Sequence, residues 1–275
     1  MSGILSGWKK VYVKGMKLMA IIKKTPAQIE AMKEAGRVSA KVLRLAGRAV
    51  EPGISTLELD SIVENLIRME GAIPSFKGLY GFPGSICASV NEQIVHGIPS
   101  ASVILKEGDI ISIDTGATVD GWVGDNAWTY PVGEISKEKQ RLLEVTEKCM
   151  WAGLDAACPG NRLGDIGNAV QSIAEAAGYG VVREYVGHGI GRRMHEDPNV
   201  PNFGHKHTGL KLQAGFCLAI EPMINMGTHE TLQCDDGWLV VTKDGMPSAH
   251  FEKSVAITED GPLVLTTEEN HRRPV

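Results

Sequence analysis

The chain has 275 residues, of which 43% are hydrophobic, and its net charge is -5 at pH 7. This length can bury the core of one large domain or two small ones. Because positive and negative side chains are interspersed, the sequence offers no basic surface for nucleic acid, and a small molecule or a peptide is the expected ligand. No apolar run approaches the roughly 18 residues of a membrane span, and no signal peptide is visible. Five cysteines without a CxxC pair predict reduced thiols and a cytoplasmic protein.

Residues 1–18 differ from the rest of the chain. Glycines and lysines are scattered there without a helical or strand period, so we interpret the segment as a loosely ordered N-terminal extension. Residues 19–275 are then expected to form a single domain. Met16 and Met19 are alternative starts of this domain, and the sequence leaves open whether the extension is an upstream start or a functional tail.

Four helices are predicted, in two pairs. The first opens at Thr25 with a capping box, which Gln28 completes, and a proline at the first helical position, and it runs to about Val50. The other three helices cover residues 56–70, 137–157 and 163–177. Strands are expected at residues 85–90, 110–115, 122–130, 216–220, 239–242 and 249–257. Helix pairs that alternate with antiparallel strands are typical of an α+β layered fold.

A short sequence pattern occurs twice, and each copy ends in a carboxylate. Residues 105–114 align without gaps on residues 212–221, 107 positions later, and the Pro-Gly pair at 52–53 aligns with the pair at 159–160. The sequence therefore predicts two pseudo-symmetric halves, each with a strand that ends in an acid. Halves that face each other would bring Asp114 and Glu221 together, and two buried carboxylates need a cation or a shared proton.

Asp120-Gly121 lies between two strand-like runs and is a strong signal for a two-residue hairpin turn. That turn would place Asp125 opposite Gly116 and diagonal to Asp114 on the same face of the sheet. Either aspartate alone would be interpreted as a solvated strand residue. Their apolar neighbours and their paired register favour a shared site.

Three further residues extend this set of possible ligands. Glu221 follows an apolar strand, Glu252 precedes another, and His188 lies in a glycine-rich segment that we expect to be a loop. Four carboxylates and one imidazole suit two Mn, Fe, Co or Zn ions better than a closed structural zinc site. Two such ions support hydrolysis, because they activate water and polarise a carbonyl.

A set of longer motifs, within about residues 19–266, resembles a known family. The motifs are Cys87-Ala88-Ser89-Val90-Asn91-Glu92, Val95-His96-Gly97-Ile98-Pro99, Asp114 through Asp125, Gly187-His188-Gly189-Ile190-Gly191, His195-Glu196-Asp197-Pro198, Ile220-Glu221-Pro222-Met223 and Phe251-Glu252. On these residues the chain resembles the type I methionine aminopeptidases, cytoplasmic enzymes of the pita-bread fold that remove the initiator methionine. The resemblance implies a monomer that acts on peptide or nascent-chain N-termini, close to the ribosome.

The resemblance also implies roles for individual residues. The ligands of a dinuclear metal centre would be Asp114, Asp125, His188, Glu221 and Glu252. Asp125 and Glu252 would be shared between the two ions, and Glu221 would also be the proton shuttle. His96 would lie near the scissile amide, and His195 would donate a hydrogen bond to the substrate carbonyl. Without the resemblance, both histidines could equally be loop residues without a function.

By the same resemblance, the pocket for the methionine side chain would involve Phe82, Cys87, Met194 and Trp238. These soft and aromatic side chains suit a thioether, although ordinary core residues would look the same. Two positions depart from the family pattern. Met194 stands where an aromatic residue is common, and Lys253 stands where a histidine is common.

Two other functions are compatible with the sequence. Xaa-Pro dipeptidases and aminopeptidase P share the five-ligand pattern and carry a further N-terminal domain, for which the 18 residues before Met19 leave no room. Non-catalytic pita-bread modules bind peptides and lack some of the ligands, whereas all five ligand positions are suitable in this sequence.

Overall fold

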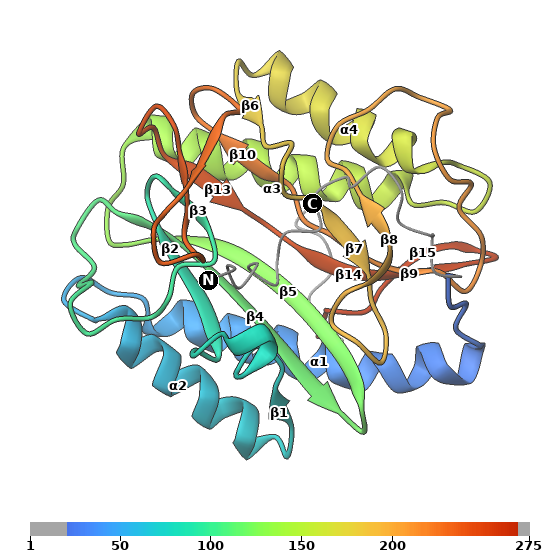
Figure 1. Ribbon diagram of the computed structural model, residues 1–275, viewed down its shortest axis with the longest axis horizontal. Coiled ribbons are helices and arrows are strands. Elements are labelled where there is room, and N and C mark those ends of the chain that lie inside the picture. Colours follow the sequence, from blue (N-terminus) through green and yellow to red (C-terminus); the bar gives the residue numbers. More distant parts are fainter. Residues whose placement is uncertain (1–20, 269–275) are drawn as a thin grey trace, which may run out of the picture.

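The structure is a computed structural model that describes residues 21–268 (Figure 1). The predicted extension at residues 1–18 and the predicted domain boundary at Met19 lie outside the described residues. Within residues 21–268, no helix is long and apolar enough to cross a membrane.

The four long helices lie where the sequence predicts them, with their ends within one or two residues of the expected positions. They are α1 (Pro26–Ala49), α2 (Thr56–Met69), α3 (Lys137–Ala156) and α4 (Leu163–Ala176), and a short 3₁₀ helix, η1 (Leu79–Gly81), follows α2. The capping box of α1 is confirmed, because the Thr25 hydroxyl accepts a hydrogen bond from the Gln28 N–H and the Gln28 side chain accepts one from the Thr25 N–H. Buried residues recur along α1 at helical spacing and face the core.

The first half of the chain forms a four-stranded antiparallel sheet in which β4 is central. The strands are β1 (Ile73–Pro74), β2 (Ile86–Val90), β4 (Ile110–Val119) and β5 (Trp122–Pro131). The predicted hairpin is confirmed, because Asp120 and Gly121 connect β4 to β5 with φ angles of 49° and 76°. Its register places Gly116 opposite Asp125, as predicted.

The second half forms a five-stranded antiparallel sheet in the order β15-β14-β9-β7-β8. These strands are β7 (Gly187–Gly189), β8 (Glu196–Val200), β9 (Cys217–Ile220), β14 (Lys253–Thr258) and β15 (Gly261–Val264). Two three-stranded sheets complete the fold. Their strands are β3 (Gln93–Val95), β6 (Gly180–Val181), β10 (Met223–Asn225), β11 (Thr231–Gln233), β12 (Val240–Thr242) and β13 (Ser248–His250).

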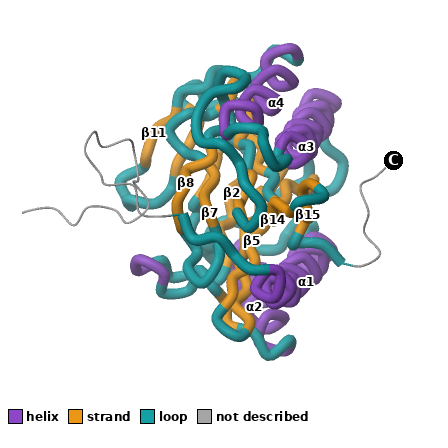
Figure 2. Tube along the Cα trace, turned by 90° about the vertical axis from the view of Figure 1, so that its right-hand side faces the viewer, coloured by secondary structure: helices purple, strands orange, loops and turns teal. Residues whose placement is uncertain are grey.

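The helix pairs lie on one side of the strands, with α1 and α2 next to the first half and α3 and α4 next to the second (Figure 2). The helix α1 crosses β5 closely. A Cβ atom at Gly124 would lie 2.5 Å from the backbone nitrogen of Gly36, so position 124 requires glycine. This crossing fixes the position of the β5 backbone at the residue that precedes Asp125.

Three details of the strands differ from the predictions. The segment 249–257 is not one strand, because β13 ends at His250 and β14 begins at Lys253. The segment around His188 is not a loop, because Gly187–Gly189 pairs with β8 and β9. A Cβ atom at Gly187 would lie 2.3 Å from the Ala219 carbonyl oxygen, so this glycine allows two strands to approach each other. Finally, β4 continues to Val119, so Asp114 lies in the middle of its strand.

Candidate metal centre and substrate site

The five predicted metal ligands line a single cavity. Asp114 and Asp125 project from β4 and β5 of the first half. His188 projects from β7, Glu221 follows β9, and Glu252 lies in the break between β13 and β14. Residues that are distant in the sequence therefore converge from both halves, as the repeated pattern predicts.

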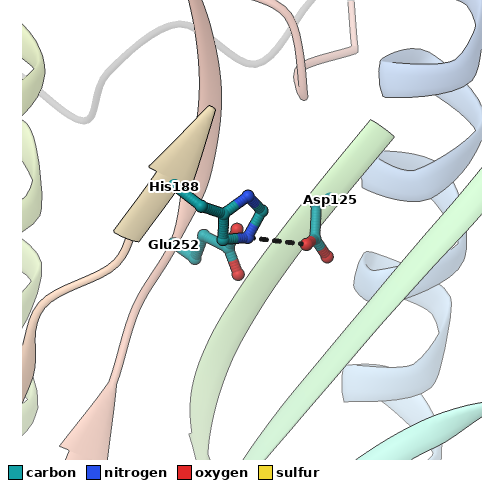
Figure 3. A group of neighbouring side chains, drawn as sticks. All are labelled: Asp125, His188 and Glu252. Atoms are coloured by element: carbon teal, nitrogen blue, oxygen red, sulfur yellow. Dashed lines mark ion pairs between the residues drawn. The ribbon is translucent and has the colours of Figure 1, made fainter. Parts of the chain in front are cut away.

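Three of these residues form a tight group. Asp125, His188 and Glu252 are all buried, and each offers a ligand atom within 4.8 Å of the others (Figure 3). His188 Nε2 lies 3.6 Å from Asp125 Oδ2 and 3.5 Å from Glu221 Oε1. Its Nδ1 lies 3.0 Å from the Gly189 carbonyl oxygen, which can only accept a hydrogen bond. Nδ1 is therefore the donor, and Nε2 is directed at the carboxylates with its lone pair available for a cation.

Burial of these acids disfavours their charged forms. Burial and the charges of Asp125 and Glu221 raise the pKa of Asp114 well above its usual value. Burial also raises the pKa of Glu252, with further increases from the neighbouring carboxylates, and it raises the pKa of Glu221 to about 8. Burial alone would lower the pKa of His188, but the neighbouring carboxylates of Asp125 and Glu221 raise it.

The donor set fits divalent cations. Asp114 Oδ1, Asp125 Oδ1 and Glu252 Oε1 are buried and have no hydrogen-bond partner among the described residues. Buried carboxylate oxygens without a partner are costly, and a cation between them would offset both the missing hydrogen bonds and the mutual repulsion. Oxygen ligands with one imidazole suit first-row divalent metals.

We expect the metal-free protein to lose thermal stability as the pH rises from about 4.5 to about 8. Because the pKa of Glu221 increases from 4.5 to about 8 on folding, the folded protein keeps a proton that the unfolded chain releases in this range. The stability that this proton provides is complete at low pH and is lost as the pH passes the folded-state value. The raised pKa of His188 acts in the same direction. The lowered pKa values of His96 and His250 act in the opposite direction below about 6.5, so the decline should be steepest above that pH.

Melting temperatures measured with a chelator across this pH range would check the prediction. Saturating Mn²⁺ should remove the decline, because bound cations compensate the ionised ligands. A flat profile in the chelator series would contradict the assignment of a proton-retaining acid cluster.

The two other predicted histidines also reach the cavity. His96 follows β3 with a φ of 62°, and its ring lies edge-on to the ring of Tyr185, with 5.8 Å between the centroids. Burial lowers the pKa of His96 to about 4, so this imidazole is neutral at neutral pH. The ring of His195 lies 4.5 Å from that of His188 and stacks on Tyr80 at 5.9 Å. Both histidines therefore lie next to the carboxylate cluster.

One histidine of the cavity wall was not expected from the sequence. His250 is 1% exposed, and its Nε2 lies 3.8 Å from Glu221 Oε2. Burial lowers its pKa to about 3, so the ring is neutral. In the sequence, the one indication that His250 belongs to the site is its position two residues before Glu252. The pairing of β13 with β10 then places it beside the site.

The four residues predicted for the methionine pocket pack together but do not form the cavity wall. Phe82, Cys87 and Met194 are buried in one hydrophobic cluster, and Trp238 packs against it. The described cavity is lined instead by apolar and aromatic residues that the sequence did not single out. These residues are Phe76, Tyr80, Val95, Tyr185, Val186 and Met223. Phe76 belongs both to this cavity wall and to the hydrophobic cluster of Phe82, Cys87 and Met194, so that cluster lies directly behind the wall.

The two positions that depart from the family pattern are both accommodated. Met194 is buried against the first half, and a Cβ atom at Gly116 would lie 2.7 Å from its terminal methyl carbon. Glycine at this position therefore makes room for the methionine. Lys253 lies over the ring of Trp128, with Nζ 5.6 Å from the centroid, and burial lowers its pKa to about 8.

Comparison with known proteins identifies the family. The model of metallopeptidase family M24 matches residues 30–259. The chain belongs to the M24 metallopeptidase family. Among its M24 relatives, methionine aminopeptidase 1 of Bacillus subtilis is 53% identical over 246 residues, which cover 90% of this chain and 99% of the relative. The predicted resemblance is thereby confirmed.

Solved structures of M24 proteins confirm the pita-bread fold. The methionine aminopeptidase of Rickettsia prowazekii superimposes with a TM-score of 0.88 at 41% identity, covering 90% of this chain and 100% of that one. A prolidase from Pyrococcus furiosus gives a TM-score of 0.72 at 23% identity, covering 90% of this chain and 66% of that one. The prolidase shares the fold, and the similarity in sequence is far greater to the methionine aminopeptidases.

Proposed function

We propose that this M24 protein is a methionine aminopeptidase that removes the N-terminal methionine from peptides and nascent proteins whose second residue is small. The observation that carries the proposal is the convergence of three buried carboxylates, the partly buried Glu221 and one imidazole from both halves, with carboxylate oxygens that lack partners among the described residues. The 53% identity to a methionine aminopeptidase supports the same substrate class.

We assign Asp114, Asp125, His188, Glu221 and Glu252 as the ligands of two divalent ions, with Asp125 and Glu252 shared between them. When bound, such ions would polarise the scissile carbonyl and lower the pKa of a water molecule. Glu221 would also accept a proton from water and pass it to the leaving amine, because its carboxylate reaches the same cavity as the other ligands.

The two histidines beside the cluster would act on the substrate itself. His195 would donate a hydrogen bond to the carbonyl oxygen as negative charge develops there. His96 would contact the scissile amide in its neutral form, in agreement with its lowered pKa. The apolar and aromatic side chains of the wall would reduce the access of water to the reacting groups when a substrate is bound.

The proposal is tested by peptide cleavage with purified protein and each of Mn²⁺, Fe²⁺, Co²⁺ and Zn²⁺. Met-Gly, Met-Ala and Met-Ser peptides should release methionine, with a sharp loss of rate when the second residue is large. Faster cleavage of Leu-Pro or Gly-Pro peptides would favour the Xaa-Pro peptidases. Peptide binding without cleavage under any metal would favour a non-catalytic module.

Replacing Cys87 or Trp238 by alanine should lower the discrimination between methionine and norleucine or leucine. Phe82 and Trp238 meet edge to face with their centroids 5.1 Å apart, and Cys87 belongs to the same cluster, so either change loosens packing behind the wall. The loss should be modest, about 10-fold, because a methylene of fit is worth only about 1 to 3 kcal/mol. The ratios of kcat/KM for the competing peptides would measure it. Unaltered ratios in both variants would place the pocket on the side of Phe76 and Tyr185.

We further propose that the protein acts as a cytoplasmic monomer on chains that emerge from the ribosome. All ligands of the proposed centre come from one chain, so the site does not require a second copy. The five cysteines are free thiols, which suits a reducing compartment. Sedimentation of the purified protein would test the monomer, and fractionation of cell extracts would test the location.

A further inference from the structure

The proposed metal centre spans the junction between the two halves, so its geometry depends on how the halves are joined. Asp125 comes from β5 in the first half, and Glu252 comes from the break between β13 and β14 in the second. On one edge β5 pairs with β4, and among the described strands it has no sheet partner on the other edge. Figure 3 shows the carboxylates of Asp125 and Glu252 directed toward each other with His188 between them.

Hydrogen bonds at alternate residues join the open edge of β5 to the second half. The Ala127 carbonyl accepts a hydrogen bond of 2.9 Å from the Glu252 N–H. The Thr129 hydroxyl accepts a bond from the His250 N–H and donates one to the His250 carbonyl, both at 2.9 Å. The Ala127 carbonyl is a backbone group and the Thr129 hydroxyl is a side-chain group two residues further along β5; we call the row of bonds along this edge the ladder.

Ser254 occupies the remaining position of this ladder. Its Oγ donates a hydrogen bond of 2.8 Å to the Asp125 carbonyl and accepts one of 3.2 Å from the Asp125 N–H. One hydroxyl thus satisfies both backbone groups of a metal-binding residue. Ser254 itself is fully buried, and its N–H donates to the Thr266 hydroxyl at 3.0 Å. The carbonyl of Ser254 accepts a bond from the Leu265 N–H at 2.8 Å, which completes its hydrogen bonding.

We propose that the Ser254 hydroxyl is a positioning group that fixes the separation of Asp125 and Glu252, and that the affinity of the centre for divalent metal depends on it. Ser254 is two residues after Glu252 in the sequence, so its bonds to Asp125 tie the two shared ligands to one another through the backbone. This inference rests on the proposed function. Groups that orient the ligands of a metal typically alter its affinity by about 10- to 100-fold when they are removed.

The test compares two hydroxyl groups of the same ladder. Ser254→Ala removes the two bonds to Asp125. Thr129→Val removes the two bonds to His250 and the bond of 2.8 Å with the Ser112 hydroxyl, while it keeps the shape of the side chain. Titration calorimetry with Mn²⁺ on metal-free protein should show about 10- to 100-fold weaker binding for Ser254→Ala. Binding to Thr129→Val should stay within about threefold of the wild type, although its melting temperature falls. Ser254→Thr keeps the hydroxyl and should restore the affinity.

The outcomes separate the possible explanations. Wild-type Mn²⁺ affinity in Ser254→Ala would overturn the positioning role. An equal loss of affinity in Thr129→Val would also overturn it, because any weakening of the junction between the halves would then explain the loss. A loss in Ser254→Thr equal to that in Ser254→Ala would also overturn it. If Ser254→Ala does not fold, Ser254→Cys is used in its place, because a thiol has a similar size but forms only weak hydrogen bonds. Wild-type Mn²⁺ affinity in Ser254→Cys would refute the proposal. A wild-type protein that binds no Mn²⁺ would refute the proposed function itself.

Discussion

Replacing His195 by alanine should lower kcat by about 10² to 10³ while metal binding stays intact, since this is the usual effect of removing one donor to a developing oxyanion. His195 stacks on Tyr80 and lies beside His188. It is not part of the group of possible metal ligands formed by Asp125, His188 and Glu252. Peptide kinetics on Met-Ala substrates, together with Mn²⁺ titration of the same preparation, would measure both properties.

A matched control is available at His207. The side chain of His207 is 87% exposed and lies beside Asp165, so His207→Ala removes a histidine without reaching the cavity. Its kcat should equal that of the wild type. Wild-type turnover in His195→Ala would remove the proposed catalytic role, and loss of Mn²⁺ binding in that variant would show that the ring supports the centre instead.

Asp125→Asn and Glu252→Gln should abolish or strongly weaken metal binding, and cleavage should fall with it. Each change removes a negative charge from a buried group of acids that repel one another unless cations lie between them. Because these residues are proposed as direct ligands, the loss of Mn²⁺ affinity should exceed the roughly 10- to 100-fold effect of groups that only support ligands. Titration calorimetry gives the stoichiometry and the affinity, and peptide assays at saturating Mn²⁺ give the rate.

The melting temperatures of the metal-free variants would show whether misfolding causes the loss of metal binding. Burial and the neighbouring acids oppose ionisation of these carboxylates, so removing one charge should leave the melting temperature in chelator unchanged or higher. Asp235→Asn is a control, because Asp235 is exposed and outside the cavity. Full metal binding and full activity in Asp125→Asn would refute the dinuclear model.

Local signals in the sequence were sufficient for the helices and for the hairpin that carries two of the acids. The capping box at Thr25 and the Asp120-Gly121 turn depend on contacts among residues a few positions apart, and the structure contains both. The repeated pattern that ends in Asp114 and Glu221 predicted two halves, and both acids reach one cavity. The motif resemblance to the methionine aminopeptidases was confirmed by the comparisons.

Contacts between distant segments determined the features of the fold and the site that the sequence did not predict. The segment around His188 became a strand because β9 and β8 lie on either side of it, and its own residues carry no period that would predict this. His250 became part of the cavity wall through its register with Met223. The bonds of Ser254 to Asp125 join residues 129 positions apart. The sequence alone predicted which residues could hold metal and which local elements carry them, whereas strand pairing across the two halves determined their separation, because such pairing depends on the whole fold.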